Sequence, residues 1–81
     1  MHSIEEIKAA INKIIDDENL NKEILDVENV GNFRYKVNFK DGSWRLIRRK
    51  NIDDYIDSEY KASKKEILTA LRIVFTGPCQ V

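Results

Sequence analysis

The side chains of this chain that could bind or transform a ligand are mostly basic, and they crowd into one stretch. Residues 33–50 hold seven Lys or Arg against one Asp, a net charge of +6, whereas residues 1–32 carry a net charge of −5. The whole chain is neutral, which argues against indiscriminate binding to nucleic acid. A local excess of this size still attracts phosphate groups or an acidic partner to one side of the molecule. The predicted anion contacts are Arg34, Lys36, Arg45, Arg48, Arg49 and Lys50.

Acidic side chains form a second candidate surface. Asp16, Asp17 and Glu18 follow the first apolar segment, and Asp53 and Asp54 follow the basic stretch. Carboxylates can mimic the phosphates of a nucleic acid and occupy a basic groove on another protein. The alternative hypothesis is therefore an inhibitor or adaptor, of the kind that phages and mobile elements encode, which binds a host protein through these acids.

Catalytic and metal-binding motifs are not indicated. His2 is the sole histidine and Cys79 the sole cysteine, so the sequence offers no acid–base pair, disulfide or cysteine-based zinc site. The acids between Asp53 and Glu59 could suggest magnesium, but no glycine-rich phosphate loop or nucleophile motif accompanies them. We expect a small binding protein that is not an enzyme and has no cofactor or metal. Its expected partner is nucleic acid or a protein complex that handles nucleic acid.

Hydrophobic alternation predicts that the basic stretch is a β-hairpin. Between Phe33 and Lys40, apolar side chains alternate with polar ones, so the two kinds lie on opposite faces of a strand. Asp41-Gly42 suits a two-residue turn of the primed type, because glycine adopts positive φ without strain. This turn predicts that Phe39 faces Trp44 and that Trp44 packs toward the core. The side chains expected on the opposite, basic face are Arg34, Lys36, Lys40, Arg45 and Arg49.

The predicted basic face is electrostatically costly. The hairpin register sets Arg34 directly opposite Arg49, and facing like charges destabilise a sheet by a few tenths of a kcal/mol or more. Asp26 and Glu28 on a preceding strand would neutralise part of the face, and charged side chains also protect sheet edges from pairing. A solvated face without a ligand therefore remains an open alternative. The run Arg48-Arg49-Lys50 adds a loop that could hold a phosphate.

Helical patterns flank the hairpin. Two capping boxes, Ser3-Ile4-Glu5-Glu6 and Ser63-Lys64-Lys65-Glu66, are each followed by apolar residues at three- and four-residue spacing. Gly77-Pro78 is typical of the end of the second helix. The expected elements are a helix over 3–18, strands over 24–28, 33–40 and 43–49, a short helical turn over 52–57, and a helix over 63–76.

The expected fold class is α+β. Both helices are apolar on one side only, so they should pack on the aromatic face of a three-stranded antiparallel meander, as a two-layer sandwich. A chain of 81 residues has room for one domain, and its hydrophobic share of 42% and charged share of 35% suit a soluble protein. No long apolar run or secretory signal pattern is present, which favours a cytoplasmic location without membrane association. Because the edges of the sheet are available for pairing with a second copy, a homodimer is an open alternative.

Two short likenesses to known families are present. The order helix, three strands, helix, with Ser63-Lys64-Lys65-Glu66 opening the last helix, is similar to double-stranded-RNA-binding domains. That resemblance implies Lys64 and Lys65 as phosphate contacts. The segment from Asp41 to Arg48 resembles the strand before the phosphate loop in the C-terminal domain of phosphohexomutases. The chain lacks the Gly-Pro-His loop of the first family and the Ser/Gly-Thr-Glu-Pro loop of the second, so neither likeness identifies it.

Overall fold

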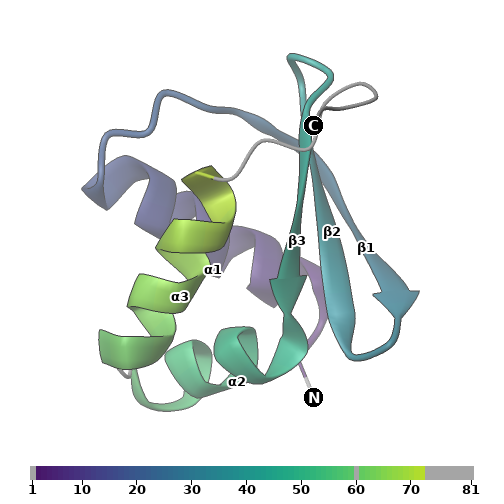
Figure 1. Cartoon of the computed structure of the whole chain (residues 1–81). Helices are drawn as coiled ribbons and strands as arrows, with labels where there is room; N and C mark the ends of the chain where they lie inside the picture. Colours follow the sequence, from purple (N-terminus) through teal and green to yellow (C-terminus); the bar gives the residue numbers. More distant parts are fainter. Residues whose placement is uncertain (1, 60, 73–81) are drawn as a thin grey trace, which may run out of the picture.

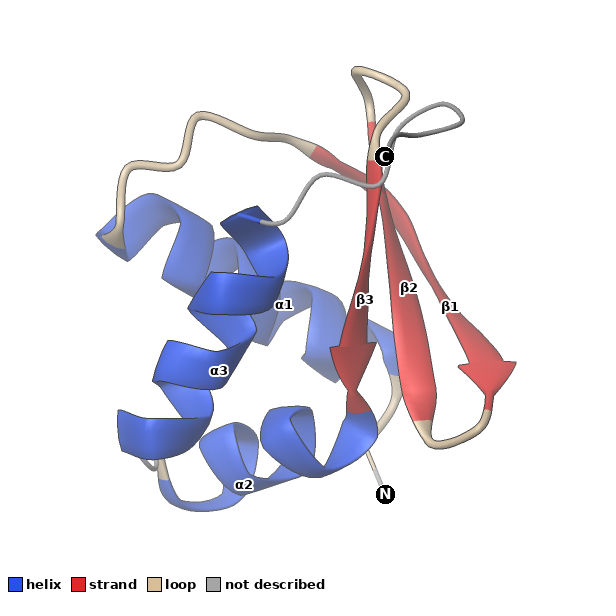
Figure 2. Cartoon of the chain, viewed as in Figure 1, coloured by secondary structure: helices blue, strands red, loops and turns tan. Residues whose placement is uncertain are grey.

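Helices cover one face of a three-stranded antiparallel sheet (Figure 1). The computed structural model describes residues 2–59 and 61–72. The elements are α1 (Ile4–Asp17), β1 (Ile24–Gly31), β2 (Arg34–Phe39), β3 (Trp44–Arg48), α2 (Arg49–Ser58) and α3 (Lys61–Arg72). The strands are ordered β1-β2-β3, with α1 packed against β1, α3 against β3, and α2 across one end (Figure 2). This arrangement confirms the predicted α+β fold class and adds α2 as a separate helix.

The first helix begins as its sequence predicts. The Ser3 hydroxyl accepts a hydrogen bond from the Glu6 N–H at 3.1 Å, and the Glu6 carboxylate accepts one from the Ser3 N–H at 3.0 Å. This reciprocal pair satisfies backbone donors that the first helical turn leaves without an intrahelical partner. The isoleucine stripe faces the sheet, and its buried members are Ile7, Ile11, Ile14 and Ile15.

The strand β1 is longer than predicted and irregular. Its pairing with β2 shifts between Ile24 and Asp26, which is the signature of a bulge. Ile24 and Val27 are consequently buried, while Leu25 is 56% exposed. Asp26 and Glu28 are exposed, as is required if they neutralise part of the outer face.

The loop between β2 and β3 is one residue longer than predicted. The Asp41 carboxylate accepts hydrogen bonds from the Ser43 N–H at 2.8 Å and from the Ser43 hydroxyl at 2.5 Å. The Phe39 N–H donates to the Ser43 carbonyl at 2.9 Å, which closes a three-residue loop over residues 40–42. Gly42 has a φ of +92°, as the last residue of such a loop requires.

The extra loop residue moves the β3 side chains to the faces opposite those predicted. Trp44 pairs with Asn38 in the observed register, so the predicted pairing of Trp44 with Phe39 is wrong. Trp44 and Leu46 lie half-buried on the outer face of the sheet, and Ile47 is buried in the core.

Arg45 is turned inward by the same shift and is 1% exposed. Its Nε donates to the Leu71 carbonyl of α3 at 2.8 Å, and its Nη1 donates to the Trp44 carbonyl at 2.9 Å. The guanidinium centre lies 5.6 Å from the centroid of the Phe39 ring. Burial lowers the pKa of Arg45, and the charge of Asp41 opposes that shift. The prediction that Arg45 is an exposed anion contact is therefore wrong, because this side chain ties β3 to α3.

The helix α2 begins directly where β3 ends. The strand stops at Arg48, one residue earlier than predicted, and Arg49 is already helical. The short helical turn expected over 52–57 is a helix of 10 residues, with Ile52 and Tyr55 buried. No loop separates the strand from this helix, so the predicted phosphate loop at Arg48-Arg49-Lys50 is instead a strand end and a first helical turn.

The last helix starts earlier than predicted. Glu59 ends α2 in the left-handed region with a φ of +48°, and α3 begins at Lys61. Ser63 consequently lies inside α3 and is buried, so the second capping box is wrong. Ile67 and Leu71 are buried as the apolar spacing predicts. The predicted end of this helix lies outside the described residues.

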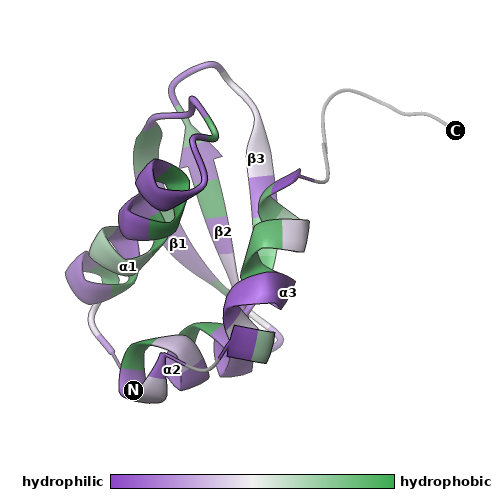
Figure 3. Cartoon of the chain, turned by 90° about the vertical axis from the view of Figure 1, so that its left-hand side faces the viewer, coloured by the Kyte–Doolittle hydropathy of each residue, from purple (hydrophilic) through white to green (hydrophobic). Residues whose placement is uncertain are grey.

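The hydrophobic core lies between the sheet and the helices. Figure 3 shows the hydrophobic stretches of α1, β2 and α3 turned toward one another. Tyr35, Val37 and Phe39 are buried on the inner face of β2 as predicted. Burial of an aliphatic side chain such as Ile contributes about 1.5–3 kcal/mol, so the isoleucines are the main stabilising residues. Within the described ranges, no helix is long and apolar enough to cross a membrane.

Replacing Arg45 should destabilise the fold. The Arg45→Ala variant leaves a cavity and removes the hydrogen bond to the Leu71 carbonyl, so we expect a loss of about 2–4 kcal/mol in the free energy of unfolding. Arg45→Met keeps an unbranched stem and should cost less than Arg45→Ala. Arg48→Ala is the control and should stay within about 0.5 kcal/mol of the wild type, because Arg48 is exposed. Urea unfolding measures these differences, and equal effects of Arg45→Ala and Arg48→Ala would contradict the observed register.

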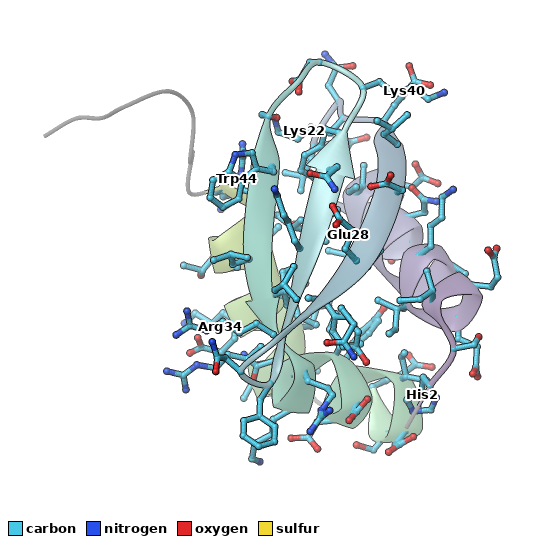
Figure 4. The ribbon with its side chains drawn as sticks, turned by 90° about the vertical axis from the view of Figure 1, so that its right-hand side faces the viewer. His2, Lys22, Glu28, Arg34, Lys40 and Trp44 are labelled. Carbon is cyan, nitrogen blue, oxygen red and sulfur yellow. The ribbon has the colours of Figure 1, made fainter. Side chains whose placement is uncertain are left out.

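His2 connects the start of α1 to α2 (Figure 4). Its Nε2 lies 2.8 Å from the Asp57 carboxylate, and its Nδ1 lies 3.5 Å from the Glu6 carboxylate. Desolvation alone would lower the pKa of His2, but hydrogen bonds and charges from Asp57 and Glu6 together raise it above 6.5. The backbone hydrogen bond from Ser3 is the largest cause that lowers the pKa of Glu6.

The contribution of His2 to stability should depend on pH. Because its pKa is raised in the folded state, protonated His2 stabilises the fold fully below the unfolded pKa of about 6.5. This contribution is lost as pH rises through the folded pKa. We expect His2→Gln to be less stable than the wild type near pH 5.5, with a difference that shrinks toward about pH 8.5. Urea midpoints across this range measure the effect, and a difference that stays constant would refute the ion pair.

Candidate functional site

The β1–β2 turn and the β3–α2 junction meet at one end of the sheet. The Arg49 N–H donates to the Phe33 carbonyl at 2.9 Å, and Arg34 pairs with Arg48 in the sheet register. A groove of about 570 Å³ opens there. We call it the basic groove, and its lining includes Phe33, Arg34, Arg48, Arg49, Lys50, Asp53 and Asp54.

The basic groove lies at the positive end of α2. The first turn of this helix contains no acid, and its N-cap residue, Arg48, makes no side-chain capping hydrogen bond. Because no carboxylate in the first turn offsets the helix dipole, its positive end adds to the charge of the basic side chains. Arg34 and Arg48 face each other as like charges, and neither has a carboxylate within ion-pair distance among the described residues. Lys50 is compensated, since its Nζ lies 3.2 Å from Asp54.

The structure brings together most of the predicted anion contacts. Arg34, Arg48 and Lys50 are exposed and Arg49 is half-buried, and all of them line the basic groove. Lys36 lies two residues further along β2, where its Nζ is 4.9 Å from the centroid of the Trp44 ring. Arg45 is absent from this surface because it points into the core.

The outer sheet face is less basic than predicted. The Asn38 amide donates to the Asp26 carboxylate at 2.7 Å and to the Glu28 carboxylate at 2.6 Å. Glu28 pairs with Lys36 in the register, and Figure 4 shows Glu28 in the middle of this face, with Arg34 toward one end and Trp44 beside β3. The positive charge is therefore concentrated at the end of the sheet that contains the basic groove.

The predicted acidic surface is divided between two environments. Asp17 and Glu18 at the end of α1 lie 3.9 and 3.7 Å from the Nζ of Lys64. This ion pairing holds Lys64 against α1, so the resemblance to double-stranded-RNA-binding domains is not supported at that residue. Asp53 and Asp54 line the basic groove instead. Among the described residues, no three acidic, histidine or cysteine side chains gather closely enough to hold a metal ion.

The carboxylate of Asp53 is partly buried in the wall of the basic groove. Its Oδ1 atom is buried and, within the described part of the chain, has no hydrogen-bond partner. An unsatisfied buried acceptor costs about 1–3 kcal/mol, so this oxygen is an unfavourable feature of the groove wall.

The β1–β2 turn holds an aromatic residue where glycine is preferred. Asn32 and Phe33 have φ values of +53° and +59°, as the central residues of a primed type I turn do. Asn-Gly is the favoured pair for such a turn, and a bulky residue in the left-handed region costs about 1–2 kcal/mol. Phe33 is 72% exposed, and the guanidinium centre of Arg49 lies 4.8 Å from its ring centroid. The prediction that Phe33 packs into the core is wrong, because the turn directs it outward.

Phe33 and Trp44 are therefore surface aromatics that the sequence pattern assigns to the core. The turn-forming residues Gly31 and Asn32 immediately before Phe33 were the available signal for its exposure. The signal for Trp44 was Ser43, whose position after Asp41-Gly42 allows the side-chain hydrogen bonds that lengthen the loop. No protein-family model, curated protein or solved structure matches this chain.

Removing the side chain at position 33 should show the strain in the turn. Phe33→Gly and Phe33→Ala both lose the contact with Arg49, but glycine alone relieves the positive φ. We expect Phe33→Gly to be more stable than Phe33→Ala by about 0.5–1 kcal/mol in urea unfolding. If Phe33→Ala proves the more stable of the two, the turn is not strained at this residue.

Proposed function

We propose that this protein is a cytoplasmic binding protein without enzymatic activity, which engages nucleic acid, alone or within a nucleic-acid-handling complex, through the basic groove. The observation that carries the proposal is the pair Arg34 and Arg48, two exposed arginines that are paired in the sheet at the positive end of α2. Within residues 2–59 and 61–72, neither has a carboxylate at ion-pair distance. Their mutual repulsion is unfavourable in the free protein, and a phosphate placed between them would remove it. Guanidinium groups match phosphate oxygens with paired hydrogen bonds.

The chemistry of the groove favours binding over catalysis. Arginine guanidinium groups stay protonated and do not act as general bases, so Arg34 and Arg48 supply charge and hydrogen bonds only. The imidazole of His2 is bonded to Asp57 near the C-terminal end of α2, whereas the groove lies at the N-terminal end of that helix. The one histidine of the sequence therefore lies away from the groove.

Binding through the acids to a host protein is the alternative function, and it has less support. Asp17 and Glu18 are engaged by Lys64, and Asp53 and Asp54 lie among the arginines of the groove. A protein that mimics nucleic acid needs its carboxylates unpaired and on one surface.

The double variant Arg34→Ala/Arg48→Ala should bind nucleic acid more weakly and with a shallower dependence on salt. Each phosphate contact on a single strand adds about 0.7 to the slope of log affinity against log salt concentration, so we expect the slope to fall by about 1.4. Fluorescence anisotropy with a labelled oligonucleotide between about 50 and 200 mM salt measures it.

The matched control is Lys13→Ala/Lys65→Ala, which removes the same charge from exposed positions on α1 and α3. This control should lower affinity only slightly and leave most of the slope intact. If the two double variants lose equal affinity, binding responds to net charge alone and the groove is not the site. The acidic alternative predicts instead that neither double variant weakens partner binding.

A further inference from the structure

We infer that the basic groove takes a single-stranded nucleic acid, one base of which stacks on the ring of Phe33. This inference rests on the proposed function and specifies its ligand. Within the groove, Phe33 is unfavourable for the stability of the fold. Phe33 occupies a turn position with a φ of +59°, where glycine would be free of strain, and its ring is 72% exposed to water. Backbone strain of this kind is concentrated at functional sites.

The ring of Phe33 is held in a defined orientation and remains available. The Arg49 guanidinium lies 4.8 Å from the ring centroid, and the Arg49 N–H is hydrogen-bonded to the Phe33 carbonyl at 2.9 Å. With 72% of the residue exposed, Arg49 covers only part of it. A flat apolar ring with a cation at one side is the arrangement on which bases of single strands stack, independently of sequence.

The charges around the ring fit the separate parts of a nucleotide. Arg34 and Arg48 lie on the sheet side of the groove and attract phosphates, whereas Asp53 and Asp54 lie on α2 and repel them. These carboxylates restrict the phosphates to the arginine side of the groove. A nucleotide whose phosphate lies beside the arginines therefore places its base over Phe33.

A second groove continues the first along the edge of the sheet. It has a volume of about 300 Å³ and shares Arg34 and Arg48 with the basic groove. It is also lined by Leu46 of β3 and by Glu66 and Thr69 of α3, so both grooves share the two arginines. Because the Glu66 carboxylate repels phosphate, a single strand that extends into this groove keeps its phosphates beside the arginines and places a base there.

A duplex fits this arrangement less well than a single strand. Paired bases are stacked on one another and expose no face to an aromatic ring, so a duplex would use the arginines but not Phe33. The contact that distinguishes a single strand from a duplex is therefore the stacked base, and not the number of phosphates bound.

The test compares a cytidine single strand of about twelve nucleotides with an abasic strand that has the same number of phosphates. Binding is measured by fluorescence anisotropy for the wild type and for Phe33→Leu, which keeps an apolar side chain but has no aromatic face. Phe33→Trp is the conservative variant that retains a stacking surface. Circular dichroism and urea unfolding establish that each variant is folded, as the exposure of Phe33 leads us to expect.

We expect the wild type to bind the cytidine strand about 5- to 150-fold more tightly than the abasic strand. Phe33→Leu should lose most of this preference while its affinity for the abasic strand stays the same, and Phe33→Trp should retain the preference. If the wild type binds both strands equally and Phe33→Leu changes neither affinity, the stacking inference is overturned and the proposed function stands. If the wild type binds neither strand, both fail.

Vesicles of phosphatidylserine provide the last comparison, because an exposed aromatic ring among arginines also suits an anionic membrane surface. If Phe33→Leu weakens binding to these vesicles and leaves binding to the cytidine strand unchanged, the ring is a membrane contact and the inference is wrong. If vesicle binding is absent, or insensitive to Phe33→Leu, while the cytidine preference depends on Phe33, the inference is supported.

Discussion

The hydrogen bonds of Asp41 with Ser43 determine the rest of the structure. They build a loop of three residues instead of two between β2 and β3, and this single extra residue decides which face each β3 side chain occupies. With this loop, Ile47 completes the core and Arg48 comes to face Arg34 at the surface. A shorter loop would bury Trp44 and Leu46 and would separate the two arginines. The carboxylate that makes these bonds is stabilised by them, since the hydrogen bonds from the Ser43 hydroxyl and N–H are the main causes that lower the pKa of Asp41.

The buried arginine follows from the same constraint. Arg45 has to occupy an inner position once the register is set, and the fold accommodates its charge with backbone carbonyls at Leu71 and Trp44 and with the ring of Phe39. The sheet and the last helix are therefore joined by a charged side chain where most small domains would use an aliphatic one.

The hydrophobic periodicity of the sequence was sufficient to predict the fold class and the first helix. The stripe from Ile7 to Ile15 and the capping box at Ser3 determine α1 locally, and the alternation of Tyr35, Val37 and Phe39 determines the inner face of β2. The β3 faces could not be predicted in the same way. The choice lay between burying Trp44 and burying Arg45, and hydrophobicity favours the first. The observed outcome depends on side-chain hydrogen bonds within one loop, for which the position of Ser43 after Asp41-Gly42 was the available signal. The site prediction shared this error at Arg45. It lacks Phe33 for a separate reason, because the β1–β2 turn directs that side chain outward.

The direct passage from β3 into α2 has a consequence for how the molecule would meet a ligand. Arg48 is the last residue of a paired strand and Arg49 the first of a helix, so neither is attached to a segment that must become ordered when something binds. Association ordinarily loses affinity to the conformational entropy of loops that are immobilised at the interface. A recognition surface made of a strand end and a helix start avoids most of that loss. For a protein of this size, such preorganisation would allow useful affinity from a small contact area.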